Sequence, residues 1–343
     1  MTYGAARIAR APGDAAMDDA PANRPQSPFE TALPAGAVVP VSASWSPMSS
    51  PIEPELAVPF TVVEPSDQTV PLVFNAPHAG AVYPQSFVDG ARLDPLALRR
   101  SEDAYVDALF AGMGALGAPM LVARFPRAYL DVNREPYELD PRMFDGRLPP
   151  YANTRSLRVA GGLGTIPRIV GDGQEIYPGK LPVAEAMRRI EWLYKPYHRA
   201  LRQIVMRTQR RFGSVLLVDC HSMPSSSVTR DENSRADIVI GDRFGTSCAA
   251  ATSDRVAQSF ERLGYRVARN RPYAGGFITE HYGEPAAGRH ALQVEINRSL
   301  YRDERTMQRT EGFARLASDI TEVFSLIAET AGTDLTERRL AAE

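Results

Sequence analysis

Two histidines, His78 and His221, each lie within three residues of the end of an apolar segment, in VPLVFNAPHAG and SVLLVDCHS. If these segments are parallel strands of one sheet, both imidazoles emerge at the same edge, where α/β proteins bind their ligands. Two histidines and one carboxylate are a common ligand set of catalytic zinc, with a fourth position left for water. The pair therefore indicates a zinc site, and the alternative is two ordinary hydrogen-bonded histidines.

The third ligand of such a site is expected to be a carboxylate from the segment Ser101-Glu102-Asp103. Asp103 and Asp107 are four residues apart and share one face of an expected helix, whereas Glu102 points elsewhere. A solvated acidic helix face is the alternative. The residue pattern alone leaves Glu102 and Asp103 both open as ligands.

Glu295 interrupts the apolar segment ALQVEI near its carboxyl end. A carboxylate at this position lies either on an exposed edge or inside a site. A metal-activated water needs a general base within hydrogen-bonding reach, and glutamate is a common one in zinc hydrolases. Glu295 is therefore the candidate general base.

Arg127 and the pair Asn133-Arg134 flank a short apolar segment that is expected to form a strand. An arginine at a strand end, next to an asparagine, suits bidentate binding of a substrate carboxylate. The alternative is a surface arginine paired with Asp131. Arg127, Asn133 and Arg134 are thus candidates for binding the substrate.

Two further residues are weaker candidates for substrate contact. Arg271, in NRPYAGG, is a second anion-binding candidate, and His281 suits either substrate contact or packing. Nucleophilic chemistry is disfavoured, because Ser222 has no GxSxG motif around it and Cys220 and His221 point to opposite faces of a strand.

Short apolar runs and helical periods alternate from about residue 58 onward. This alternation favours an α/β sandwich around a mostly parallel or mixed sheet. Lys195-Pro196 predicts a kink in the longest helix. The expected strands cover residues 70–75, 120–123, 129–132, 214–218, 236–240, 265–268 and 291–296, and the expected helices cover residues 94–116, 182–212, 247–263 and 305–331.

The charge balance excludes some classes of partner. The formal net charge is −2, which gives no electrostatic reason to expect nucleic acid or an anionic membrane as a partner. No stretch of about 18 apolar residues occurs, so no membrane-spanning segment is expected.

The two cysteines, Cys220 and Cys248, are too few for a disulfide framework, and the expected location is the cytoplasm. Nothing in the sequence indicates an oligomeric state.

The N-terminal region differs from the rest of the chain. Residues 1–57 are rich in Ala, Pro and Ser and have no apolar period, so they are expected to form a flexible leader. Residues 58–335 are expected to form a single catalytic domain, and residues 336–343 a short tail.

Six motifs, in this order, resemble those of the N-formylglutamate amidohydrolases: PHAGAVYP, SED…VD (residues 101–107), FPRAYLDVNREP, LLVDCHSMPS, NRPYAGGFITEHYG and HALQVEINRSLY. The resemblance extends over residues of about 70 to 330. That family is related to the zinc carboxypeptidases and aspartoacylases. The resemblance therefore implies a three-layer α/β/α sandwich around a mixed sheet, of the phosphorylase/hydrolase-like type.

The same resemblance implies a zinc site with one ion per chain. Carried over by position, it makes His78 and His221 zinc ligands and favours Asp103 over Glu102 as the third. Glu295 resembles the general base of the carboxypeptidase-like sites.

For the substrate, the resemblance suggests that the segment Asp131–Arg134 clamps a carboxylate and that Arg127 binds the oxyanion or the substrate. The implied reaction is hydrolysis of N-formyl-L-glutamate to formate and L-glutamate, which closes one route of histidine degradation. A zinc-activated water would attack the formyl carbon while a glutamate takes its proton.

Two alternatives to this function remain. The chain reads DCHS and DVNREP where family members often read DAHS and DLNRP, so a deacylase of another N-acyl amino acid or a carboxypeptidase-like hydrolase is the first. A non-catalytic amino-acid binding protein is the second, and the complete set of His78, Asp103, His221 and Glu295 argues against it.

Overall fold

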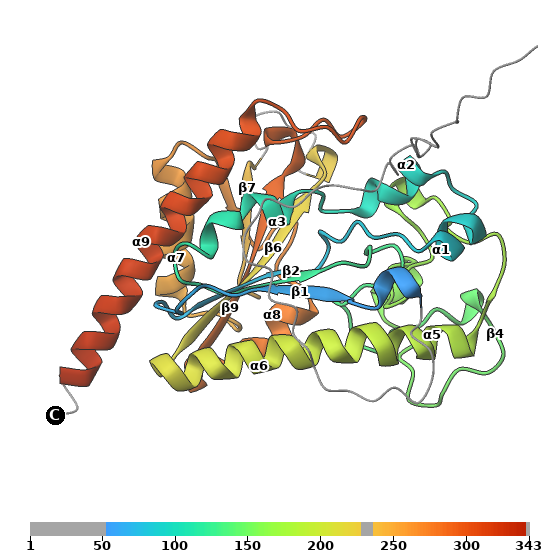
Figure 1. Cartoon of the computed structure of the whole chain (residues 1–343), viewed down its shortest axis with the longest axis horizontal. Coiled ribbons are helices and arrows are strands. Elements are labelled where there is room, and N and C mark those ends of the chain that lie inside the picture. The colour runs from blue at the N-terminus through green and yellow to red at the C-terminus, as the bar shows by residue number, and fades with distance from the viewer. Residues whose placement is uncertain (1–52, 228–235, 341–343) are drawn as a thin grey trace, which may run out of the picture.

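A seven-stranded sheet forms the centre of the molecule in the computed structural model, which describes residues 53–227 and 236–340 (Figure 1). The strands follow the order β1-β3-β2-β6-β9-β7-β8 across the sheet. Their bounds are Phe60–Val63 (β1), Leu72–Ala76 (β2), Met120–Ala123 (β3), Val215–Met223 (β6), Ile238–Gly241 (β7), Val267–Arg269 (β8) and Arg289–Asn297 (β9).

The four middle strands, β3, β2, β6 and β9, run parallel to one another. β1 and β7 pair antiparallel on either side of them, so the sheet is mixed, as expected. The register places Asn75 beside Asp219 and His221 beside Glu295. The carboxyl ends of β2, β6 and β9 therefore meet at one edge, which is the condition on which the two-histidine prediction depended.

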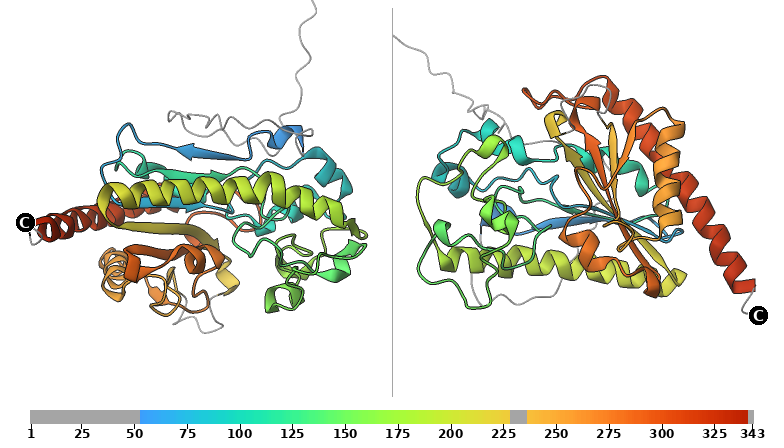
Figure 2. Two further views of the ribbon diagram at one scale, coloured as in Figure 1. Left: turned by 90° about the horizontal axis from the view of Figure 1, so that it is seen from below. Right: turned by 180° about the vertical axis from the view of Figure 1, so that it is seen from behind.

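Helices cover both faces of this sheet (Figures 1 and 2). On one face, Val73, Leu121 and Leu217 pack in the core that includes the buried side chains of α6. On the other, Phe74 and Val218 pack in the core that includes α7 and α9. The predicted three-layer α/β/α sandwich is thus confirmed. The bounds of the longer helices are Val183–Arg189 (α5), Lys195–Phe212 (α6), Ala250–Arg262 (α7), Phe277–Tyr282 (α8) and Gly312–Leu340 (α9).

Short elements and loops form a lobe at one end of the sheet (Figure 1). Residues from this lobe, among them Leu163 and Ile169, line the same pocket as Asp103 and Glu295, so the lobe closes one side of that pocket. Its elements are Gln85–Gly90 (α1), Pro95–Leu98 (α2), Leu157–Ala160 (α4) and a two-stranded parallel sheet of Phe144–Asp145 (β4) and Leu181–Pro182 (β5).

The prediction of one helix over residues 94–116 is wrong. After α2 the chain makes a 3-10 turn, Glu102 is extended, and Tyr105 has a positive φ of 65° before α3 (Val106–Leu109) begins. The backbone amide of Asp103 donates to the carbonyl of His78 at 3.0 Å. Successive residues of a helix point about 100° apart, so a continuous helix would not turn both Glu102 and Asp103 inward to their separate partners.

The strand predicted at residues 129–132 is also absent. The Tyr129 amide donates to the Pro126 carbonyl at 2.9 Å, and the Asp131 amide donates to the Thr165 carbonyl at 2.9 Å, so this segment is a buried turn. The Asn133 amide donates to the Asp131 side chain at 2.8 Å. The apolar residues that suggested a strand are apolar because the turn is buried.

The interruption expected in the long helix takes the form of a single π turn, Ile190–Tyr194, between α5 and α6. There the Lys195 amide donates to the Ile190 carbonyl, five residues back. Pro196 follows directly and has no amide hydrogen for the regular bond, which accounts for the break in the α pattern at this point.

The ends of the folded unit differ from the expected boundaries. Pro54–Leu56 form a 3-10 turn and Leu56 is buried in the core, although the leader was expected to reach residue 57. The rest of that leader, residues 1–52, lies outside the described residues. α9 continues to Leu340, through most of the expected tail. Within the described ranges, no helix combines the length and the apolar character that crossing a membrane requires.

His198 ties α6 to the turn before Asn133. Its Nε2 lies 2.9 Å from the Val132 carbonyl and therefore donates to it, and its Nδ1 lies 3.0 Å from the Tyr282 hydroxyl. Burial lowers the pKa of His198 from 6.5 to about 4. His198 is thus a neutral structural residue.

We expect this burial to make the protein less stable in acid. Because the unfolded chain takes up the proton at a higher pH than the folded one, stability falls as the pH decreases from about 6.5 towards 4. The contribution of His198 amounts to a loss of about 2 kcal/mol between pH 7 and pH 5. Urea unfolding of the wild type and of His198→Gln tests this, since the stability advantage of the wild type should shrink by that amount. An unchanged difference at both pH values would contradict it.

Candidate active site

The two histidines reach the site from adjacent strands. His78 lies in the turn after β2, where Gly80 is needed because a Cβ there would collide with the backbone at Phe125. His221 lies within β6, which extends five residues beyond the predicted end. Its neighbour Cys220 faces the opposite side of the sheet and packs in the core under α7 and α9, as the strand alternation predicted.

Three buried side chains meet at the carboxyl edge of the sheet: His78, Asp103 and His221. Each offers one ligand-type atom, and these atoms all lie within 4.8 Å of one another. Asp103 Oδ2 is 3.0 Å from His221 Nδ1 and 3.4 Å from His78 Nδ1. The alternative acid, Glu102, pairs with Arg99 at 2.9 Å instead. The structure therefore brings Asp103, and not Glu102, to the histidines.

The orientation of Asp103 is set by two residues that sequence analysis did not identify. Its Oδ1 accepts hydrogen bonds from Ser222 Oγ at 3.1 Å and from Arg298 Nη2 at 3.0 Å, so Oδ2 is left to face the histidines. Burial alone would raise the pKa of Asp103, but the hydrogen bond from His221, the proximity of His78 and the charge of Arg298 lower it well below its usual value. Both residues lie within motifs quoted above, LLVDCHSMPS and HALQVEINRSLY, and that membership was the available signal.

A second carboxylate holds the outer nitrogen of each imidazole. Asp131 Oδ1 lies 2.8 Å from His78 Nε2, and Asp219 Oδ2 lies 2.8 Å from His221 Nε2. Such pairs fix the ring orientation of metal-ligating histidines and increase their basicity. Burial lowers the pKa of His221, but Asp219 and Asp103 together raise it well above its usual value. Among the described residues, the buried His78 Nδ1 has no hydrogen-bond partner.

Asp219 is in turn held by a buried polar network. Asn75 Nδ2 donates to its Oδ1 at 2.7 Å, and Asn133 Nδ2 donates to its Oδ2 at 3.1 Å. Tyr197 donates its hydroxyl hydrogen to Asn75 Oδ1 at 2.5 Å. A buried polar group is tolerated when it is hydrogen-bonded in this way, so the network holds the Asp219 side chain in place.

Glu295, on β9, lies beside His221 in the sheet. Burial raises its pKa to about 7, with the charge of Asp103 adding to the effect and those of His221 and Arg127 opposing it. Gln293 Nε2 donates to its Oε1 at 2.8 Å. A carboxyl group with a pKa near neutrality both accepts and releases a proton readily at neutral pH.

Part of this site lines a pocket of about 380 Å³. Its wall includes Asp103 and Glu295, together with Arg127 and Arg134. Arg127 Nε donates to Asp131 Oδ2 at 3.0 Å, while its two Nη groups have no partner in the described part of the chain. The pocket thus places arginine side chains beside the buried carboxyl group of Glu295 and beside Asp103, one of the three potential ligands.

Arg134 reaches the pocket but is largely committed to the protein. Its Nε and Nη1 donate to the carbonyls of Leu163 and Asn133 at 2.8 and 2.7 Å, and its Nη2 lies 3.4 Å from Asp131 Oδ2. Burial lowers its pKa to about 10. Asp131, expected to be part of a substrate clamp, instead orients His78 and the two arginines.

Three residues predicted to contact substrate lie elsewhere. Asn133 is behind the histidines, because its amide nitrogen binds Asp219 and its oxygen accepts from the Ile278 amide at 2.8 Å. Arg271 is exposed and does not line the pocket. His281 is exposed on α8 and stacks on Phe277 with ring centroids 5.0 Å apart. Their positions within loop motifs did not indicate which way they point.

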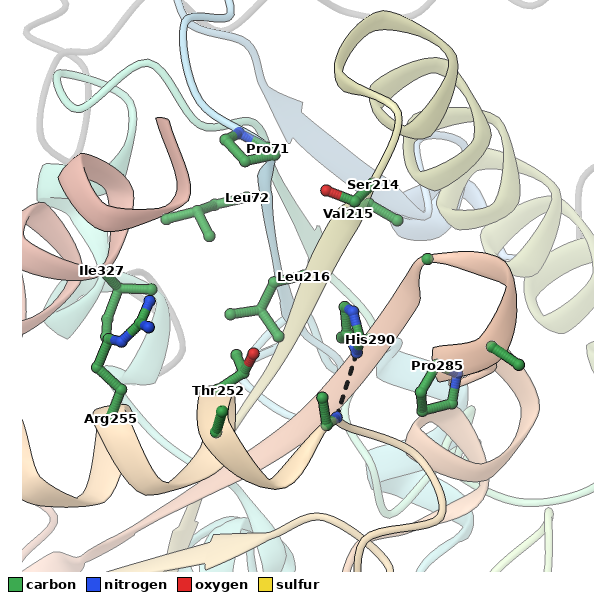
Figure 3. Close-up of a pocket in the computed structure, with 14 residues that line it drawn as sticks. Pro71, Leu72, Ser214, Val215, Leu216, Thr252, Arg255, Pro285, His290 and Ile327 are labelled. Carbon is green, nitrogen blue, oxygen red and sulfur yellow. Dashed lines mark hydrogen bonds between the residues drawn. The ribbon is translucent and has the colours of Figure 1, made fainter. Parts of the chain in front are cut away.

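Another pocket, of about 500 Å³, lies at the opposite edge of the sheet (Figure 3). It is lined by the starts of β2, β6 and β9 and by the first turns of α7, and none of its lining residues is acidic. His290 Nδ1 accepts a hydrogen bond from the Ala249 amide at 3.2 Å there. It offers neither the carboxylates nor the converging imidazoles found at the carboxyl edge.

Known proteins match this chain over most of its length. The family model of N-formylglutamate amidohydrolase matches residues 70–302. The chain belongs to the N-formylglutamate amidohydrolase family. The recognition made from the six motifs is thereby confirmed, and the matched range contains all three potential ligands and Glu295.

Individual members of the N-formylglutamate amidohydrolase family are also similar. N-formylglutamate deformylase of Pseudomonas putida is 30% identical over 68% of this chain and 83% of its own length. The crystal structure of N-formylglutamate amidohydrolase from Ralstonia eutropha JMP134 is 40% identical, with a TM-score of 0.76 over 80% of this chain and 99% of that one. A protein of Agrobacterium tumefaciens, 20% identical with a TM-score of 0.57, shares the fold.

Proposed function

We propose that this protein hydrolyses the amide bond of N-formyl-L-glutamate to formate and L-glutamate, as a step of histidine degradation. The observation that carries the proposal is the convergence of His78, Asp103 and His221 in a family member, with Asp103 and Glu295 both in the wall of one pocket. Both cysteines are free and buried, in keeping with a reducing cytoplasm as the proposed location.

The residues present fit one zinc ion per chain. His78 Nδ1 is a buried nitrogen without a hydrogen-bond partner in the described part of the chain, and it faces the same carboxylate oxygen as His221 Nδ1. The Nε2 atoms are already occupied by Asp131 and Asp219, so both rings would bind through Nδ1. A zinc ion bound by two histidines and a carboxylate supplies Lewis-acid polarisation of the carbonyl and acidifies a water molecule.

The protein's own side chains transfer the protons and stabilise the negative charge that develops. Glu295 takes a proton from the attacking water as its oxygen bonds to the formyl carbon, and returns it to the nitrogen as the carbon–nitrogen bond breaks. Arg127, with its free Nη groups in the same pocket, donates hydrogen bonds to the oxygen that becomes negative. Arg127 and Nη2 of Arg134 also attract a substrate carboxylate, which orients the scissile bond.

A panel of N-formyl and N-acetyl amino acids, assayed with and without a chelator, tests this function. We expect N-formyl-L-glutamate to be cleaved fastest and chelation to abolish turnover. Faster cleavage of an N-acetyl amino acid would identify a different deacylase. Binding of these compounds without any turnover in the zinc-loaded protein would identify an amino-acid binding protein.

Replacing Asp219 with asparagine is expected to weaken zinc binding by about 10- to 100-fold, the usual effect of removing the carboxylate partner of a ligating histidine. The substitution keeps the size of the side chain and an acceptor for Asn75. Competition with a chromogenic chelator measures the change, and Asp237→Asn, at a half-buried aspartate paired with the exposed Arg266, is the matched control. Equal zinc affinity in Asp219→Asn and the wild type would show that Asp219 has no such role.

A further inference from the structure

A second cavity, of about 340 Å³, adjoins the catalytic pocket. The two cavities share Arg100, Gly171, Pro224 and Arg298 in their walls. Arg298 connects them, because it donates to Asp103 on one side and, through Nη1, to the Arg100 carbonyl at 3.2 Å. The guanidinium group of Arg298 therefore separates Asp103 from this second cavity. We term the second cavity the basic chamber.

Arg302, in the wall of the basic chamber, is a buried cation without a carboxylate partner. Its side chain is 2% exposed. Nη2 donates to the Glu102 carbonyl at 3.3 Å, Nη1 contacts Met307 Sδ at 2.6 Å, and Nε has no hydrogen-bond partner among residues 53–227 and 236–340. No Asp or Glu of the described ranges forms an ion pair with it. A buried charge of this kind is costly unless an anion compensates it.

The remaining charges of the chamber are also mostly positive. Arg100 and Arg305 are exposed in its wall together with Arg298, and Glu304 is the acidic residue among the lining residues. Glu304 Oε1 accepts a hydrogen bond from the Ser225 amide at 3.0 Å, so it is engaged with the adjacent loop. Burial and the charge of Arg298 lower the pKa of Arg302, and the charges of Asp103 and Glu102 oppose this effect.

We propose that the basic chamber binds a carboxylate group through Arg302 and Arg305. A guanidinium pairs with the two oxygens of a carboxylate in a planar, directional way, and the chamber offers several guanidinium groups and little competing acid. This inference rests on the proposed function only for the source of the carboxylate. The source is either the distal carboxylate of the substrate in the adjoining pocket or a free carboxylate such as the released formate.

Binding of acetate to the protein as purified tests the shared chemistry. Thermal-shift titration should give saturable stabilisation that persists in Arg127→Gln, while the dissociation constant rises by about tenfold or more in Arg302→Gln and Arg305→Gln. Arg315→Gln is the matched control, at an exposed arginine of α9. Circular dichroism checks folding, and if Arg302→Gln does not fold, the exposed Arg305→Gln decides. Acetate affinities of the foldable chamber variants within about twofold of the wild type would overturn the proposal.

Kinetics of Arg305→Gln distinguish the two sources. If the chamber holds the distal carboxylate, kcat/KM falls about tenfold or more for N-formyl-L-glutamate but hardly changes for N-formyl-L-methionine, which lacks that group. If it holds a free carboxylate, both kcat/KM values are unchanged and the inhibition constant of formate rises with the acetate dissociation constant. Should the wild type hydrolyse neither compound, the proposed function fails, and the acetate titration still decides whether the chamber binds carboxylates.

Discussion

Replacing Glu295 with glutamine is expected to reduce kcat by about 100- to 10,000-fold, the range that general acid–base catalysis contributes. Glutamine has nearly the same shape but neither accepts the proton of the attacking water nor returns it to the leaving nitrogen. KM should change little, because the base acts in the transition state rather than in substrate binding. Steady-state kinetics with N-formyl-L-glutamate measure both constants.

The zinc content of Glu295→Gln should equal that of the wild type, because Glu295 lies outside the cluster of His78, Asp103 and His221. Glu322→Gln, an exposed position on α9, is the matched control and should retain full activity. Activity of Glu295→Gln within a few-fold of the wild type would remove the base assignment. Loss of zinc from this variant would instead place Glu295 among the ligands.

The second large effect is expected for Asp103→Asn, which should weaken zinc binding by more than about 100-fold, since even the residues behind a ligand contribute 10- to 100-fold. The neutral amide is a poor zinc ligand, and it no longer balances the positive charge of the ion. Its Oδ1 position still accepts from Ser222 and Arg298, so the fold should persist. Metal analysis after dialysis and chelator competition provide the measurement.

Asp107→Asn is the matched control for this substitution. Asp107 lies one helical turn further on, in α3, and is not part of the cluster of potential ligands. Sequence analysis placed Asp103 and Asp107 on one helix face and did not separate them. The structure predicts that only the substitution at Asp103 lowers zinc affinity. Equal zinc affinity in Asp103→Asn and the wild type would exclude Asp103 as a ligand, and the same result for His78→Ala and His221→Ala would exclude the site.

The sheet was predictable because a strand that is buried on both faces appears in the sequence as a continuous apolar run. β2, β3 and β9 lie where continuous apolar runs predicted them, and parallel pairing of β2 with β6 brings His78 and His221 to one edge. The two histidines and Glu295 were found in this way, since each is a polar residue at or near the end of such a run. The family resemblance then selected Asp103, which geometry supports.

Apolar periodicity gave wrong predictions of secondary structure where the buried segment is a turn rather than a helix or strand. The segments at residues 94–116 and 129–132 carry apolar residues because they are buried, and the amides of Asp103 and Asp131 bond to carbonyls far away in sequence. Asp103, for example, is held through its amide by His78 and through its side chain by Arg298. No local pattern encodes contacts between residues so far apart along the chain.

Side-chain direction was the other property that only the tertiary structure decided. Asn133, Arg134 and Arg271 belong to recognisable motifs, yet Asn133 lies behind the histidines, Arg134 is largely bonded to carbonyl groups and Arg271 is exposed. The kinds of residue that the chemistry needs can therefore be identified from the amino-acid sequence. Which of them face the pocket depends on hydrogen bonds between segments that are adjacent only after the chain has folded.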